Sequence, residues 1–151
     1  MKIAVFPGSF DPITRGHESI VKRALSLFDE IIIGIGQNTG KHYYFSHDRR
    51  EHFIKNVFEG ESKIKVMHYS GLTVNFCKEI NANYILRGLR TSADFEFERA
   101  IAQMNRTMAP EIETVFLVSD PALSHISSTI VRDILLYSGD VSAFVPDAVK
   151  V

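Results

Sequence analysis

The sequence predicts a doubly wound α/β fold around a five-stranded parallel sheet, and two observations lead to that prediction. Five short apolar segments of strand type alternate along the chain with amphipathic segments of helical period. No repeat, low-complexity stretch or linker interrupts the alternation. Alternating strands and helices are typical of parallel sheets, whose right-handed crossovers place helices on both faces. We therefore expect a single domain over residues 1–151.

The five strand segments differ in how evenly apolar they are. They lie at residues 3–6, 31–35, 64–68, 84–86 and 115–118. The second is apolar throughout, which favours a central strand, whereas Lys63, Lys65 and Met67 alternate with apolar residues in the third, which favours an edge. In the commonest order of such folds, the first and fourth strands are neighbours where the winding reverses. Ligands bind outside the carboxyl ends of those two strands.

The helices are bounded by residues that start and stop helices. We expect helices over residues 14–28, 46–58, 73–81, 91–109 and 127–137. Thr91 and Asp94 resemble a capping box at the start of the longest helix, and Ser127 is expected to cap the last one. Gly139 is expected at the C′ position of that last helix. The segment 140–151 leaves room for a short terminal helix.

Composition narrows the class of protein. The chain is 45% hydrophobic and 23% charged, as expected for a globular domain. Its formal net charge is −1 with basic residues spread along the sequence, so we expect no nucleic acid and no membrane as partner. Cys77 is the only cysteine, which excludes an internal disulfide and favours a core position. With no signal-peptide pattern, the expected location is cytoplasmic.

The first seventeen residues carry the strongest functional signal. The first strand breaks at the loop Pro7-Gly8-Ser9-Phe10-Asp11-Pro12, and Thr14 opens a helix. A glycine loop before a helix N-terminus offers free N–H groups and the positive end of the helix dipole to a phosphate. Ser9 adds a hydroxyl, and His17 lies one turn into the helix. Such turns also occur in α/β domains without a ligand. Residues outside this stretch must therefore decide whether the loop binds a phosphate.

Cationic side chains on other loops of the same sheet edge favour a ligand. Arg87 and Arg90 follow the fourth strand, and Lys41 lies in the loop after the second. The hydroxyl-rich segment Ile126-Ser127-Ser128-Thr129 starts another helix there. Taken singly, each is more readily a surface charge or a helix cap. Together they favour a polyphosphate, because guanidinium groups bind phosphates bidentately.

Motifs for other chemistries are missing. The chain has no His-Glu-x-x-His or paired-cysteine spacing, no Walker lysine motif, no Gly-x-Gly-x-x-Gly and no Gly-x-Ser-x-Gly. We expect no metal site built from side chains. Asp94, Glu96 and Glu98 are interpreted as partners of a helix dipole. The remaining histidines are expected to be surface or structural residues: His42, His47, His52, His68 and His125.

Several stretches resemble a known superfamily, the nucleotidyltransferases with an x-Gly-His motif. They are Gly8–Pro12, Thr14–His17 and Ile126–Arg132. Thr14 lies where many relatives carry another His. Together with Arg87–Arg90, Asp94–Glu98 and Asn105-Arg106, it is similar to the bacterial phosphopantetheine adenylyltransferases, and the resemblance covers nearly the whole chain.

The resemblance implies a Rossmann-like nucleotidyltransferase fold and a reaction. That reaction is adenylyl transfer from ATP to phosphopantetheine with Mg²⁺, giving dephospho-coenzyme A and pyrophosphate in coenzyme A biosynthesis with no covalent enzyme intermediate. The implied catalytic residues are His17, Ser9, Lys41 and Arg90. Those implied for ATP are Ser9, Phe10, His17, Gly88, Leu89, Arg90, Glu98, Leu123, Ser124, His125, Ile126, Ser127, Ser128 and Thr129. Those implied for phosphopantetheine are Ser9, Lys41, Thr73 and Arg87, and the implied assembly is a homohexamer.

Two alternatives stay open at this point. The first is a sister nucleotidyltransferase that acts on nicotinamide mononucleotide or an alcohol phosphate, against which Thr14 and the Arg87–Arg90 loop argue. The second is a nucleotide-sensing module without turnover, against which the intact His17, Lys41, Arg87 and Arg90 argue. The chain also departs from its relatives, because Ser9 replaces the usual Thr and Leu123 replaces a residue that is often aromatic.

Overall fold

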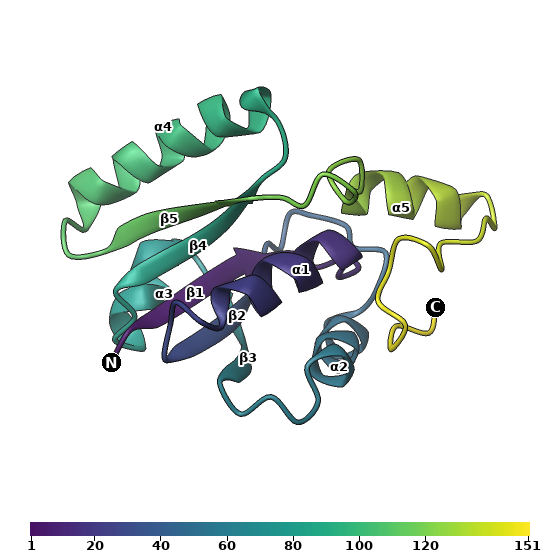
Figure 1. Ribbon diagram of the computed structural model, residues 1–151, viewed down its shortest axis with the longest axis horizontal. Coiled ribbons are helices and arrows are strands. Elements are labelled where there is room, and N and C mark those ends of the chain that lie inside the picture. Colours follow the sequence, from purple (N-terminus) through teal and green to yellow (C-terminus); the bar gives the residue numbers. More distant parts are fainter.

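The computed structural model describes residues 1–151 and contains one five-stranded parallel sheet (Figure 1). The strands are β1 (Ile3–Gly8), β2 (Glu30–Gln37), β3 (Ile64–Ser70), β4 (Tyr84–Leu89) and β5 (Glu113–Val118). Their order is β3-β2-β1-β4-β5, with all four pairings parallel. The predicted doubly wound fold is confirmed, with β1 beside β4 and β3 at an edge.

Helices cover both faces of the sheet. They are α1 (Arg15–Ala24), α2 (His47–Val57), α3 (Thr73–Glu79), α4 (Ser92–Met108) and α5 (Ser128–Leu136). Alternate strand residues point to opposite faces. Accordingly, Ala4 and Phe6 join the larger core cluster with α1, α2 and α5, while Val5 joins a smaller cluster with α3. None of the helices combines the length and apolar content needed to span a membrane.

The expected capping box at the start of α4 is wrong in one half. The Thr91 hydroxyl accepts the Asp94 N–H at 3.1 Å, as expected of an N-cap. The Asp94 carboxylate, however, accepts the N–H of Arg90 at 3.0 Å instead of that of Thr91. Its side chain reaches one residue past the cap, so the two bonds are not reciprocal.

The end of α5 also differs from the expectation. The helix ends at Leu136, and Ser138 takes the left-handed conformation with φ 58°. Gly139 was expected at that place but lies one residue further on, where its N–H donates to the Ile134 carbonyl at 2.9 Å. The expectation failed because the helix stops one residue earlier than its apolar pattern suggests.

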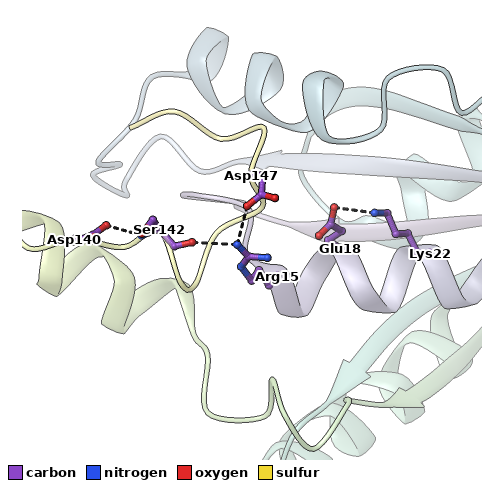
Figure 2. Close-up of polar contacts among 6 residues, drawn as sticks. All are labelled: Arg15, Glu18, Lys22, Asp140, Ser142 and Asp147. Atoms are coloured by element: carbon purple, nitrogen blue, oxygen red, sulfur yellow. Dashed lines mark hydrogen bonds and ion pairs between the residues drawn. The ribbon is translucent and has the colours of Figure 1, made fainter.

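Residues after α5 form no terminal helix and lie instead against the start of α1 (Figure 2). Arg15 donates from Nη2 to the Ser142 carbonyl at 3.1 Å and forms an ion pair with Asp147 at 2.9 Å. The Arg15 N–H also donates to the Phe144 carbonyl at 2.9 Å. These long-range bonds hold the segment to α1, while its own backbone bonds form only isolated turns, such as Val145 N–H to the Val141 carbonyl and Val149 N–H to the Pro146 carbonyl.

Candidate active site

Two cavities open at the carboxyl ends of β1 and β4. The first, which we call the Lys41 cavity, has a volume of about 370 Å³ and is also lined by Ser9 and Thr73. The second, the His17 cavity, has a volume of about 280 Å³ and is also lined by Arg90. Both cavities share four residues, which are Pro7, Gly8, Arg87 and Glu98. The switch point predicted from the strand order is therefore where the cavities meet.

The Lys41 cavity brings together every residue expected to hold phosphopantetheine, namely Ser9, Lys41, Thr73 and Arg87. Lys41 Nζ donates to Ser9 Oγ at 3.0 Å although the two residues lie on different loops. The Thr73 hydroxyl is 2.9 Å from the Tyr69 hydroxyl. Tyr69 and Asn105 also line this cavity. Asn105 belongs to the Asn105-Arg106 pair of the family resemblance, although no role was expected for it, whereas no sequence pattern distinguished Tyr69 from a core or surface residue.

The His17 cavity brings together most of the residues expected to hold ATP. Those that line it are His17, Gly88, Arg90, Glu98, Leu123, Ile126, Ser127, Ser128 and Thr129. Ser9 lines the Lys41 cavity instead. Phe10, Leu89, Ser124 and His125 line neither cavity. The buried Phe10 ring packs edge-on against His17 with 5.1 Å between centroids, so it supports the His17 side chain.

A reciprocal capping box fixes the orientation of His17. Its N–H donates to Thr14 Oγ1 at 3.3 Å, and its Nδ1 accepts the Thr14 N–H at 3.0 Å. His17 therefore takes the place that Glu or Gln normally has in this motif. Since Nδ1 is an acceptor, the proton of the neutral ring is on Nε2.

The His17 ring is neutral at ordinary pH. Burial, with further contributions from Arg87 and Arg90, lowers its pKa from 6.5 to about 4. A neutral ring with Nδ1 occupied offers one N–H donor from Nε2. This is a hydrogen-bond donor of fixed position on the wall of the His17 cavity.

Two helix N-termini meet at the His17 cavity. Thr14 caps α1 and Ser127 caps α5, and both residues line the cavity. Ser128 Oγ donates to the Pro12 carbonyl at 2.9 Å, which ties α5 to the glycine loop. The positive ends of both helix dipoles favour an anion there.

Arg87 and Glu98 form an ion pair between the two cavities. Arg87 binds the carboxylate bidentately, with Nη2 at 2.6 Å from Oε1 and Nε at 3.0 Å from Oε2. Its Nη1 donates to the Pro7 carbonyl at 2.8 Å. The helix-dipole interpretation therefore fits Asp94 in the first turn of α4 but is wrong for Glu98. Glu96 instead pairs with Arg99.

Arg90 lines the His17 cavity together with His17. Its Nη1 donates to the Ile126 carbonyl at 2.9 Å, and its Nε lies 3.4 Å from Asp94 Oδ2. Arg90 thus links the loop after β4 to the segment that precedes α5. The expected convergence of separate loops on one site is present, with both Arg90 and His17 on the His17 cavity.

Several of the remaining histidines and the cysteine lie outside the cavities and contact other side chains or the core. His68 Nε2 lies 2.9 Å from Glu51, and His52 Nε2 lies 3.1 Å from Asn56. Cys77 is fully buried, and burial raises the pKa of its thiol to about 11, so the expected core position is confirmed. No group of three or more His, Cys, Asp or Glu side chains is arranged to hold a metal ion.

Comparisons with known proteins show the family of the chain. A family model described as cytidylyltransferase-like matches residues 5–134. A phosphopantetheine adenylyltransferase of Flavobacterium psychrophilum is 54% identical over 100% of this chain and 99% of its own length. That of Bacteroides thetaiotaomicron is 48% identical over the same shares.

Solved structures agree in fold. A crystal structure from Vibrio parahaemolyticus has a TM-score of 0.69 at 21% identity and covers 98% of this chain and 90% of its own. A bifunctional NMN adenylyltransferase/ADP ribose pyrophosphatase from Francisella tularensis also has a TM-score of 0.69, at 17% identity over 95% of this chain and 44% of its own. From the full-length sequence matches, the chain belongs to the cytidylyltransferase-like family and, within it, to the phosphopantetheine adenylyltransferases.

Proposed function

We propose that this chain transfers the adenylyl group of ATP to phosphopantetheine, giving dephospho-coenzyme A and pyrophosphate in coenzyme A biosynthesis. The observation that carries the proposal is the pair of adjoining cavities, which share Gly8, Arg87 and Glu98. A transfer between two substrates needs two sites that meet where the bond forms. Relatives at about half identity over their full length bear the name of this activity.

The His17 cavity is the proposed ATP site. The Nε2 proton of His17 is available to the α-phosphate, while Arg90 and the N-termini of α1 and α5 favour the outer phosphates. Negative charge grows on the α-phosphate as it is attacked. A donor held in place beforehand stabilises that charge without reorganising during the reaction.

The Lys41 cavity is the proposed phosphopantetheine site. Lys41 and Arg87 neutralise the phosphate of the acceptor, whose oxygen attacks the α-phosphorus of ATP. The bond between that phosphorus and the bridging oxygen to the β-phosphate breaks, so pyrophosphate leaves with its electron pair. The attacking phosphate is already ionised at neutral pH, so no general base is required, and catalysis comes from alignment and charge neutralisation.

Mg²⁺ is proposed to accompany the triphosphate. The carboxylates on the His17 cavity are Asp94 and Glu98, and each is paired with an arginine. These side chains do not form a cage for the ion. They fit an ion held mainly by phosphate oxygens and water, which is how Mg²⁺ usually binds in nucleotide sites, where it supplies charge neutralisation.

A pyrophosphate-release assay tests the proposal. ATP is offered with phosphopantetheine, nicotinamide mononucleotide or glycerol phosphate, and we expect turnover with phosphopantetheine alone. Turnover with either other acceptor would favour a sister nucleotidyltransferase. ATP binding without pyrophosphate release for any acceptor would favour a nucleotide-sensing module.

We also propose a homohexamer in the cytoplasm. Four apolar residues of α4 follow one face of the helix and are exposed, among them Phe97 at 68% and Met104 at 69%, with Ile101 and Met108 completing the face. An apolar face of this kind is typical of a protein interface. Light scattering on the wild type should give six times the chain mass, and Met104→Glu should give smaller species. A wild type that is monomeric at micromolar concentration would contradict the assembly.

A further inference from the structure

We propose that Arg50 is a positioning residue for adenylyl transfer, which holds Ser9 and Lys41 in register from beneath the site. The inference rests on the proposed function and adds a residue that lines neither cavity. Arg50 lies in the first turn of α2, and its exposed fraction is 0%. A fully buried guanidinium is uncommon in a domain of this size and has a cost unless its N–H groups are satisfied.

The guanidinium donates to both loops that carry the catalytic residues. Its Nη1 donates to the Ser9 carbonyl at 2.8 Å, and its Nε donates to the Phe45 carbonyl at 3.1 Å. Phe45 ends the loop that contains Lys41. Arg50 therefore bridges the backbone on the two sides of the 3.0 Å contact between Lys41 Nζ and Ser9 Oγ.

The remaining contacts of Arg50 reach the wall of the Lys41 cavity. Its Cζ lies 4.0 Å from the centre of the Tyr43 ring, and Tyr43 lines that cavity. Its Nη2 lies 3.0 Å from His47 Nδ1, which serves as the acceptor. All three nitrogens of the guanidinium and one face of its plane therefore have a partner. Because the group is planar and rigid, it fixes the relative positions of its four partners, which are Ser9, Tyr43, Phe45 and His47.

Asp11 makes the opposite connection between the same two loops. Its carboxylate accepts the N–H of Tyr44 at 2.7 Å and that of Phe45 at 2.8 Å. Arg50 reaches from α2 to the glycine loop, whereas Asp11 reaches from the glycine loop to the Lys41 loop. The two buried charges also balance each other, because Asp11 opposes the lowering of the Arg50 pKa by burial.

This arrangement has a consequence for catalysis. Lys41 and Ser9 lie on separate loops that have no strand pairing with one another at these residues. Their distance from each other depends on the connection below them. A displacement of about 1 Å in a catalytic group can cost about 100-fold in rate, so a loosened Arg50 should lower kcat more than it changes substrate affinity.

The test compares Arg50→Lys with Arg49→Lys in the pyrophosphate-release assay. Lysine keeps the charge at position 50 but cannot reach four partners, so kcat should fall about 10- to 100-fold with KM for ATP changed less than about threefold. Arg49 is the matched control, because it is on the same helix and stacks on Phe45 and Phe53 away from both cavities. Its variant should keep the kcat of the wild type.

A double-mutant cycle separates positioning from a merely structural role. In a Ser9→Ala chain, Arg50→Lys should cost at most about threefold, because the contact between Lys41 and Ser9 that Arg50 holds in register is already lost. A structural role would instead give multiplicative losses that follow the folded fraction, measured by denaturant unfolding. That result, or a normal kcat for Arg50→Lys, would overturn the inference.

A second variant tests the inference if Arg50→Lys does not fold. His47→Ala removes one acceptor of the guanidinium, and its control is His52→Ala on the same helix. We expect a lower kcat for His47→Ala and the wild-type kcat for His52→Ala. Equal kcat values for the two variants would overturn the inference. If the wild type releases no pyrophosphate with any acceptor, the proposed function and this inference both fall. If only the variants behave like their controls, the inference alone falls.

Discussion

Helices α1 and α4 border the same site but are held in place in different ways. α1 buries Ile20, Val21 and Ala24 against the sheet, and its first turn is closed by a reciprocal capping box. α4 has 17 residues against 10 in α1, yet its one buried residue is Glu98, a charged side chain that pairs with Arg87. Its apolar residues Phe97, Ile101, Met104 and Met108 are exposed instead.

The difference shows how the two cavities are built. The His17 side is fixed by the core of the chain, so its hydrogen-bond donor is in place before any substrate arrives. The side next to α4 depends on an ion pair whose arginine is partly accessible to both cavities. We therefore expect changes on the α1 side to lower kcat, and changes on the α4 side to alter stability and substrate affinity.

The largest effect is expected for His17→Ala. The Nε2 proton is most useful when charge grows on the α-phosphate, so kcat should fall about 100- to 1,000-fold while KM for ATP stays within about threefold. Steady-state kinetics of pyrophosphate release measures both. Equal losses in kcat and in ATP affinity would show that His17 binds the ground state instead.

The next effect is expected for Glu98→Gln on the α4 side. Removal of one partner leaves the Arg87 charge without its carboxylate and should lower the free energy of unfolding by about 1–3 kcal/mol. KM for phosphopantetheine should also change. The matched control is Glu96→Gln, since Glu96 pairs with Arg99 on the exposed face of α4 and should cost less than about 0.5 kcal/mol. Equal losses for the two variants would contradict the proposed role of the ion pair.

A smaller effect is expected for Thr14→Ala, which removes the N-cap of α1. The free energy of unfolding should fall by about 1 kcal/mol, and kcat should fall several-fold because the His17 ring loses part of its support. Thr14→Ser retains the hydroxyl and should restore both quantities to near the wild-type values. Thermal unfolding together with the kinetic assay measures the pair, and a Ser variant as impaired as the Ala variant would contradict the capping explanation.

The last expected effect appears only below pH 6.5, as a pH dependence of stability. Because the His17 pKa is lowered from 6.5 to about 4 in the folded chain, the unfolded chain binds more protons between these values. Stability from this residue is present above pH 6.5 and decreases as the pH falls toward 4, by at most about 1.4 kcal/mol per pH unit. Denaturant unfolding of wild type and His17→Gln at pH 7 and pH 5 measures it. Identical pH dependence would contradict a lowered pKa of His17.

Short-range patterns were the part that the sequence could predict. The strand order, the glycine loop and the placement of Ser9, Lys41, Arg87 and His17 near one sheet edge follow from alternation and from local motifs. The capping box was expected at α4 and found at α1, because a rule based on Glu and Gln does not include a histidine that accepts through Nδ1.

Long-range side-chain contacts could not be predicted. The helical period places Arg50, but not Arg49, in line with the apolar residues Phe53 and Ile54. It does not reveal that the guanidinium is bonded to Ser9, which lies 41 positions away. Glu98 has an acidic side chain near a helix start, which the sequence relates to the dipole, yet its partner lies on β4. Such pairings depend on how the elements pack, and that information is in the tertiary structure alone.

The contact of Arg15 with the segment after α5 affects the order in which the molecule can be completed during synthesis. Its partners Ser142 and Asp147 (Figure 2) lie 127 and 132 positions further along the chain, so they leave the ribosome long after Arg15 does. Until then, the turn that holds His17 lacks its outer anchor. A nascent chain can therefore assemble its sheet well before the turn that holds His17 is secured, and proteolytic removal of residues 140–151 would return the folded chain to that earlier state.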